Sequence, residues 1–262
     1  METVFTASYR VRSYETDFLR RVKPATLLNY LQDAASSHAA VLGFSVADLL
    51  QKNLTWVLSR YQVRVYRYPF EGEEIRVRTW RSAVDSFHAL RDFEVVDEYD
   101  RTLAVASSSW LIINLDSRRP VRIKTAVDDF PVHPYRSFPG DFCMLPKCDA
   151  SERELVFRVR MADLDQNRHV NHVVYPEWAF ETIPEAVLNS RLPAEIHIAY
   201  RAEAVYGSKI ISRSAVTDLP DTATYLHQII DESDGKELAR LKTVWHPVDS
   251  LCAGQINWEA TE

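Results

Sequence analysis

Cysteines are few in this sequence, and their arrangement suggests neither a cross-link nor a metal centre. The three cysteines, Cys143, Cys148 and Cys252, are odd in number, and no two of them form a C-x-x-C pair. Disulfide frameworks and structural zinc sites both depend on paired cysteines, so the sequence favours neither of them. We therefore expect no metal site, and we expect the protein to work in the reducing cytoplasm.

Long apolar runs and an excess of basic charge are missing as well. No stretch approaches the ~18 consecutive apolar residues of a membrane-spanning helix. The first residues include an acid, Glu2, and lack the apolar segment of a signal peptide. The formal net charge is −6, whereas binding to nucleic acid or to an anionic membrane needs a concentrated basic face. We expect neither of them as a partner.

What the sequence does contain is an internal repeat. Residues 9–12 and 157–160 both read aromatic-Arg-Val-Arg, which defines a first offset between the copies (157 − 9 = 148). Residues 103–110 and 238–245 match at a second offset (238 − 103 = 135). Two copies of one unit, each roughly a hundred residues long, explain the length of the chain.

Both copies show the same order of predicted elements. In the first copy a strand precedes a helix that begins at Pro24 and ends near Gly43, and a run of strands with two-residue periodicity follows. The predicted strands are 3–13, 57–65, 75–79, 87–96 and 103–115 in the first copy and 153–162, 194–203, 208–217, 222–231 and 237–246 in the second, which also has predicted helices at 172–183 and 184–191.

A helix followed by antiparallel strands predicts an α+β fold in which a curved sheet wraps a long central helix, the arrangement called a hotdog. The sequence thus predicts a tandem (double) hotdog, with an N-terminal copy at 1–117 and a C-terminal copy at 152–262. Residues 118–151 between them carry five of the twelve prolines. We expect this segment to be an extended linker.

The polar side chains with the clearest chemical potential lie in the second copy. Asp165, Asn167 and His169 occupy alternate positions just before the predicted helix at 172–183. Alternate side chains of an extended segment point the same way, so these three are expected to converge. Free N–H groups at the start of the helix can polarise a carbonyl oxygen. This combination is typical of hydrolysis.

The motif Asp163-Leu-Asp-x-Asn-x-His-Val-Asn, with Tyr175 and Trp178 downstream and Tyr200-Arg-x-Glu203 after it, resembles the acyl-acyl carrier protein thioesterases. The similarity extends over nearly the whole chain. It implies that the protein hydrolyses the thioester between a fatty acyl chain and acyl carrier protein, releases a free fatty acid and needs no cofactor. It also implies four catalytic residues, which are Asp165, Asn167, His169 and Glu203.

Residue 204 departs from the pattern of the plant members, which carry a cysteine directly after the catalytic glutamate. This chain has Ala204 there, so the expected mechanism is attack by water that a general base activates. The sequence leaves the base open among Asp165, Glu203 and His169. No plastid-targeting extension precedes the first copy, so we expect a bacterial-type member.

The repeat provides an internal control for these assignments. The first copy has Leu19 in the place of Asn167 and Arg21 in the place of His169, so neither polar residue is required twice for folding. Asp17 matches Asp165, which is therefore expected to act partly as a turn residue. Strand alternation would place Glu203 opposite Ile196 and Ile198 unless a bulge turns it.

The first copy, without the polar residues, is expected to bind the acyl chain, with Trp56 and Leu58 as candidate lining. The expected partner is acyl carrier protein carrying a fatty acyl chain, and a homodimer is left open. Basic residues that could meet the acidic carrier are Arg20, Arg21, Lys23, Arg118, Arg119 and Arg168.

Three alternatives share much of this pattern. An acyl-CoA thioesterase would perform the same chemistry on a different carrier. A hydratase or dehydratase of the hotdog fold would also place a histidine and an acid near a helix. A non-catalytic sensor of acyl thioesters would bind without turnover, although binding alone does not require the polar quartet.

Overall fold

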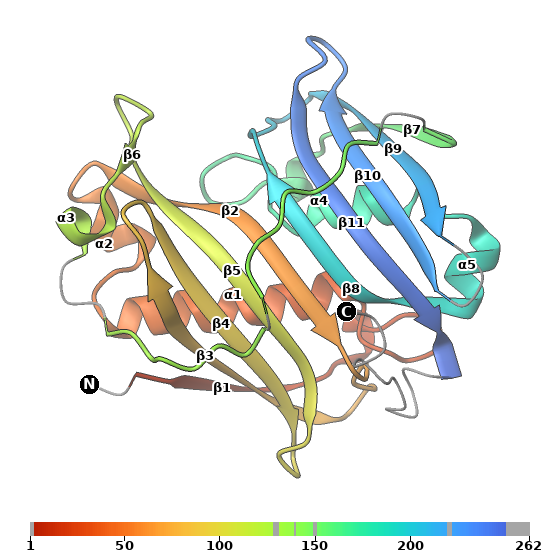
Figure 1. Ribbon diagram of the computed structural model, residues 1–262, viewed down its shortest axis with the longest axis horizontal. Coiled ribbons are helices and arrows are strands. Elements are labelled where there is room, and N and C mark those ends of the chain that lie inside the picture. The colour runs from red at the N-terminus through yellow and green to blue at the C-terminus, as the bar shows by residue number, and fades with distance from the viewer. Residues whose placement is uncertain (1–2, 128–130, 139, 149–150, 219–221, 250–262) are drawn as a thin grey trace. The chain divides into compact units, whose positions relative to one another are not determined.

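The computed structural model describes residues 3–127, 131–138, 140–148, 151–218 and 222–249 (Figure 1). The chain divides into two compact units. Unit 1 comprises Met1–Arg64 and Tyr68–Asp141, and unit 2 comprises Val65–Arg67 and Phe142–Glu262. Both units combine antiparallel strands with helices, so the fold is α+β as predicted. No helix in these described ranges is long and apolar enough to cross a membrane.

Unit 1 contains a sheet in the order β1-β3-β4-β5-β2, with the short strand β6 paired to β5. The pairings of β1 with β3, β3 with β4, and β4 with β5 are antiparallel. Its elements are β1 (Phe5–Arg10), α1 (Pro24–Val41), α2 (Val46–Leu50), β2 (Leu54–Val65), β3 (Glu74–Val84), β4 (His88–Asp97), β5 (Thr102–Asn114), β6 (Pro120–Val121) and α3 (Ile123–Ala126).

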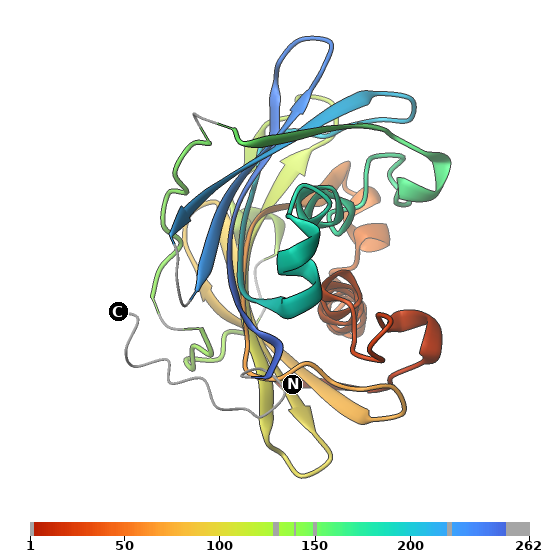
Figure 2. The same ribbon diagram turned by 90° about the vertical axis from the view of Figure 1, so that its right-hand side faces the viewer.

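Helix α1 is the 18-residue helix that the sequence predicts between Pro24 and Gly43. Pro24 opens it, where a missing N–H costs nothing, and Gly43 follows its end with a φ of 75°, which glycine adopts without strain. Figure 2 shows α1 lying against one face of the sheet of unit 1. The stripe that faces the sheet is almost inaccessible to solvent and consists of Leu27, Leu28, Leu31, Ala34 and Ala35.

Unit 2 contains a sheet in the order β8-β11-β10-β9-β7, with antiparallel neighbours throughout. Helices α4 and α5 lie on one face of this sheet (Figure 2). Its elements are β7 (Arg153–Arg158), α4 (Val174–Phe180), α5 (Glu185–Ser190), β8 (Arg191–Tyr200), β9 (Lys209–Asp218), β10 (Ala223–Asp231) and β11 (Glu237–Pro247).

The expectation of a long central helix is wrong for unit 2, because α4 has only seven residues. Proline explains where the helical path breaks. Pro184 disfavours helical backbone at the residue before it and cannot donate to the preceding turn. The hydroxyl of Thr182 donates to the carbonyl of Ala179 at 2.6 Å, which satisfies one of the last acceptors of α4.

Residues 131–138, within the segment predicted to be a linker, are held to unit 1 by hydrogen bonds. The amide of His133 donates to the carbonyl of Arg81 at 2.8 Å, and the indole of Trp80 donates to the carbonyl of Tyr135 at 2.7 Å. The amide of Ser137 donates to the buried carboxylate of Asp92 at 2.7 Å. This part of the segment is therefore anchored along its length.

Candidate active site

Residues 165–169 of unit 2 form a tight turn between a 3-10 turn, Met161–Asp163, and helix α4. The amide of Asp165 donates to the carbonyl of His169 at 2.8 Å, and the amide of Arg168 donates to the carbonyl of Asp165 at 3.0 Å. Arg168 has a φ of 62°. The extended segment expected from the alternating polar residues is therefore wrong, and the turn sets where the three side chains lie.

The carboxylate of Asp165 holds this turn from inside. Its Oδ1 accepts hydrogen bonds from the amides of Asn167 at 2.8 Å and His169 at 3.3 Å. An aspartate that accepts from the backbone two residues ahead is a common turn device, and it explains why the alternating pattern did not make a strand.

The same turn occurs in unit 1 at the first offset of the repeat, with Asp17 in the place of Asp165. Asp17 Oδ1 accepts from the amides of Leu19 at 2.8 Å and Arg21 at 2.9 Å, and Arg20 has a φ of 64°. The second offset is also reproduced, because Arg21 forms a β-bridge with Phe70 in unit 1 and His169 forms one with Val205 in unit 2. Asp165 and Asp17 thus share a structural role.

His169 and Glu203 come together in unit 2. The Nε2 atom of His169 lies 3.5 Å from a carboxylate oxygen of Glu203, and the two side chains are 30% and 37% exposed. Strand β8 ends at Tyr200, so Glu203 lies in the segment beyond the strand and the predicted alternation of faces does not apply to it. An imidazole beside a carboxylate can take a proton from a reacting group and give it back.

Asn167 lies at the exposed tip of the turn. Its amide is used by Asp165, and its side chain is open to solvent. Of the four residues predicted to be catalytic, the structure thus pairs the side chains of His169 and Glu203. Asp165 holds the turn, and the side chain of Asn167 is exposed on the loop that carries His169.

In unit 1 an ion pair replaces the corresponding pair. Arg21 Nη2 lies 2.9 Å from Asp17 Oδ2, and the Arg21 side chain is only 3% exposed. Tyr68, which the second offset matches to Glu203, is fully buried. Arg21 is therefore unavailable to meet a carrier protein, which corrects its place among the basic residues predicted to do so. Arg20 stays on the surface, where it pairs with Glu71 at 2.9 Å.

The start of α4 does not offer the row of free N–H groups that the sequence suggested. The amide of Val173 donates to Asn171 Oδ1 at 3.3 Å, and the amide of Val174 donates to the carbonyl of Asn171 at 3.0 Å. Pro176 has no N–H to offer. Asn171 therefore satisfies two of the first donors, and the oxyanion site at this helix start stays a prediction.

Tyr175 has a polar role that the sequence did not reveal. The amide of Ala204, next to Glu203, donates to the Tyr175 hydroxyl at 3.3 Å in a buried contact. The ring packs edge-on against Trp178 and Tyr200, with centroids 5.5 and 5.8 Å away. The sequence could not reveal this contact, because the donor on Ala204 is a backbone N–H, which leaves no mark in the sequence.

Trp56 and Leu58, predicted to line an acyl site, lie on β2 of unit 1. The indole of Trp56 donates to the carbonyl of Phe44 at 2.9 Å, and its ring packs against an apolar cluster that includes Leu49 and Ile112. Leu58 is partly buried. Their role in binding stays a prediction.

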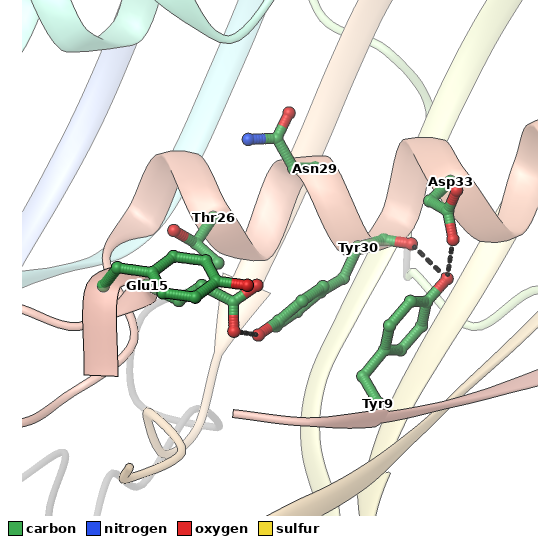
Figure 3. Close-up of a pocket in the computed structure, with 7 residues that line it drawn as sticks. Tyr9, Glu15, Thr26, Asn29, Tyr30 and Asp33 are labelled. Carbon is green, nitrogen blue, oxygen red and sulfur yellow. Dashed lines mark hydrogen bonds between the residues drawn. The ribbon is translucent and has the colours of Figure 1, made fainter. Parts of the chain in front are cut away.

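A pocket of about 420 Å³ lies in unit 1 beside α1 and β1 (Figure 3). The hydroxyl of Tyr9 donates to Asp33 at 2.7 Å, and the hydroxyl of Tyr30 donates to Glu15 at 2.8 Å. None of the predicted site residues lines it; the lining residues are Tyr9, Tyr14, Glu15, Thr26, Asn29, Tyr30 and Asp33.

Metal ligands and thiols do not gather around the turn. Within the described ranges, no three His, Cys, Asp or Glu side chains are grouped so that they could hold a metal ion. Cys143 is exposed and Cys148 is buried, and neither forms a disulfide. Cys252 lies outside the described residues.

Fold and site together define an α+β protein in which a histidine on a short loop lies beside a glutamate from the segment after β8, a pair suited to proton transfer. Residues 2–130 match the acyl-ACP thioesterase N-terminal domain, and residues 147–247 match the acyl-ACP thioesterase C-terminal domain. The chain belongs to the acyl-acyl carrier protein thioesterase family.

Relatives of known name agree with this assignment. The chain is 31% identical, over 92% of its length, to the chloroplastic palmitoyl-acyl carrier protein thioesterase of Arabidopsis thaliana. It is 31% identical, over 93% of its length, to the protein of that name from Gossypium hirsutum. It spans 64% of the length of each of these relatives.

Solved structures show the same fold. The 12:0-ACP thioesterase of Umbellularia californica superposes with a TM-score of 0.84 at 25% identity, covering 94% of both chains. An acyl-ACP thioesterase of Bacteroides thetaiotaomicron superposes with a TM-score of 0.83 at 24% identity, covering 93% of this chain and 98% of its own.

Proposed function

We propose that the chain hydrolyses the thioester that links a fatty acyl group to acyl carrier protein and releases a free fatty acid. The observation that carries the proposal is the approach of His169 to Glu203, at 3.5 Å. In unit 1 the loop matching that of His169 has the same backbone, but Arg21 and Tyr68 stand in place of His169 and Glu203. Relatives at 31% identity are named palmitoyl-acyl carrier protein thioesterases.

The proposed reaction uses water as the nucleophile, because the buried methyl group of Ala204 offers none. The His169–Glu203 pair removes a proton from water, and the water oxygen forms a bond to the thioester carbon. The carbon–sulfur bond then breaks, and the departing thiolate of the carrier takes up a proton. General-base assistance of this kind contributes about 3–5 kcal/mol to lowering the barrier.

The two remaining residues of the predicted quartet receive distinct roles in this proposal. Asp165 shapes the turn through Oδ1, and in this proposal its second oxygen is the one that takes part in the reaction. Asn167, with its exposed amide at the tip of the turn, orients water or the thioester. We leave the general base open between His169 and Glu203, with Asp165 as the third candidate.

We further propose that the two units form the tandem hotdog predicted from the sequence, with chemistry in unit 2 and acyl-chain binding in unit 1. Each unit has an antiparallel sheet with a helix against one face, and the turn before that helix repeats bond for bond. Trp56 and Leu58 remain the proposed lining. A homodimer and a cytoplasmic location remain predictions from the sequence.

The test is release of free thiol from matched substrates. Wild-type protein should release thiol from acyl carrier protein carrying a fatty acyl chain faster than from the same acyl group on CoA. A faster rate on CoA would favour the acyl-CoA alternative. Hydration or dehydration of the acyl group without thiol release would favour a hydratase or dehydratase. Binding without any reaction would favour a sensor.

Variants in the turn of unit 2, compared with a matched variant in the turn of unit 1, test which unit carries the reaction. We expect His169→Ala and Asn167→Ala to lower kcat by roughly ten- to a hundredfold at nearly unchanged Tm, because both side chains are partly or fully exposed. Leu19→Ala, the equivalent of Asn167→Ala in unit 1, serves as the control and should keep wild-type turnover. Equal losses from Leu19→Ala and Asn167→Ala in folded proteins would contradict the proposal.

A further inference from the structure

The hydroxyl of Tyr175 contacts the backbone next to Glu203 and has no counterpart in unit 1. It accepts the amide of Ala204 at 3.3 Å, and the two residues are 3% and 2% exposed. The carbonyl of Ala204 in turn accepts the amide of Val170 at 3.0 Å. Through residue 204, Tyr175 is therefore linked both to the segment that carries Glu203 and to the loop that carries His169.

In unit 1 the corresponding contact between the turn and the segment after the strand forms without a hydroxyl. Pro69, which the second offset matches to Ala204, accepts the amide of Val22 at 2.9 Å, so the backbone arrangement is the same. Leu27, which the first offset matches to Tyr175, is buried in place of the phenol. Proline has no N–H and needs no acceptor. The fold can therefore form this contact without an N–H at the position of Ala204 and without a phenol at the position of Tyr175.

A phenol that accepts one hydrogen bond still has its own proton to donate. Burial raises the pKa of the Tyr175 hydroxyl, the amide of Ala204 lowers it, and the nearby charges of Glu203 and Asp165 raise it further. The hydroxyl is therefore protonated at neutral pH. The hydroxyl is close enough to the carboxylates of Glu203 and Asp165 to feel their charge. It is also bonded to Ala204, the residue directly after Glu203.

We infer that Tyr175 is a positioning residue for the reaction proposed above, on which this inference rests. Its hydroxyl fixes the segment 203–205 against the His169 loop, and its remaining proton favours the nearby negative charge of Glu203, so that this carboxylate stays aligned with the imidazole. Groups that support a catalytic pair in this way act mainly on turnover, since alignment matters most in the transition state.

Two variants separate this role from simple satisfaction of a buried amide. Tyr175→Phe removes the hydroxyl and leaves the Ala204 N–H without an acceptor, which lowers both stability and alignment. Tyr175→Phe combined with Ala204→Pro also removes that N–H. It reproduces the arrangement in unit 1, where proline and an apolar side chain occupy these two positions. Ala204→Pro alone carries the same backbone change but keeps the hydroxyl, so it is the matched reference for the double variant.

We expect kcat on acyl carrier protein substrates to fall about tenfold or more in Tyr175→Phe, with KM changed less than about twofold. The double variant should regain Tm but keep a kcat about tenfold below that of Ala204→Pro. Equal kcat in these last two proteins would overturn the inference, because the hydroxyl would then serve only the amide.

If the proline variants fail to fold, Tyr175→Phe decides alone, measured well below its Tm against wild type. A kcat equal to that of wild type would overturn the inference while the proposed function stands. Absence of thiol release from wild-type protein would overturn both, so the two failures are distinguishable.

Discussion

His227 is a fully buried imidazole in unit 2, on β10, where its Nε2 meets the hydroxyl of Thr243 at 2.9 Å. Burial lowers the pKa of His227 to about 3. In the unfolded chain a histidine titrates near 6.5, so between pH 6.5 and 3 the unfolded state takes up a proton that the folded state refuses. Stability is unaffected by this group above that window and falls as the pH drops through it.

We predict that His227→Gln lessens the acid sensitivity of the protein. Each such histidine costs about 1.4 kcal/mol per pH unit within the window, or about 2 kcal/mol between pH 7 and pH 5. The free energy of unfolding, measured by urea titration at both pH values, should fall by about 2 kcal/mol less in the variant than in wild type. An equal fall in both proteins would contradict the lowered pKa.

At the scale of elements, Asp92 on β4 anchors the chain that follows α3. Its carboxylate is completely buried, and it accepts from the hydroxyls of Ser82 and Ser107, both at 2.8 Å, and from the amide of Ser137 at 2.7 Å. Arg136 adds an ion pair at 3.2 Å. A buried charge of this kind is tolerable only because it is paired and hydrogen-bonded.

We predict that Asp92→Ala lowers the free energy of unfolding by about 3–5 kcal/mol and speeds tryptic cleavage at Arg136, because the donors lose their acceptor. Glu94→Gln on the same strand is the matched control. Glu94 pairs with Arg78 at 3.3 Å at a part-exposed site, and its loss should cost less than about 1 kcal/mol. Similar losses from both variants would argue against the anchor.

Elements also show how far the sequence could predict the structure. Pro24 and Gly43 located α1 to within a residue or two, and two-residue periodicity located the long strands, because helix ends and burial impose those patterns directly. The turn role of Asp165 followed from its match to Asp17, whereas the backbone path of residues 165–169 and the contact of Tyr175 with Ala204 could not be predicted in this way. Both depend on backbone donors, which all residues except proline share.

At the scale of the whole molecule, the division of labour between the units can be tested through the acyl chain. If unit 1 binds the acyl chain, substitutions in unit 1 should change which acyl chain lengths are preferred. Substitutions at the turn of unit 2 should change turnover for all acyl chain lengths alike. Each methylene buried contributes about 0.8 kcal/mol, so preference should rise with length until the site is filled.

We predict that Trp56→Ala and Leu58→Trp shift the chain length of maximal kcat/KM in opposite directions, because one opens space on β2 and the other fills it. The measurement is hydrolysis across a series of acyl carrier protein substrates for wild type and both variants, with His169→Ala as the reference for a loss independent of length. A profile unmoved by both β2 variants would show that unit 1 does not bind the acyl chain.

The turn at residues 17–21 differs by few substitutions from the proposed active site of unit 2. Its hydrogen bonds already match those of 165–169, so no backbone has to be rebuilt to convert it. Only side chains separate the two, and the substitutions are Leu19→Asn, Arg21→His, Leu27→Tyr, Tyr68→Glu and Pro69→Ala. The chain thus carries a template for designing a second centre on a loop that is already folded.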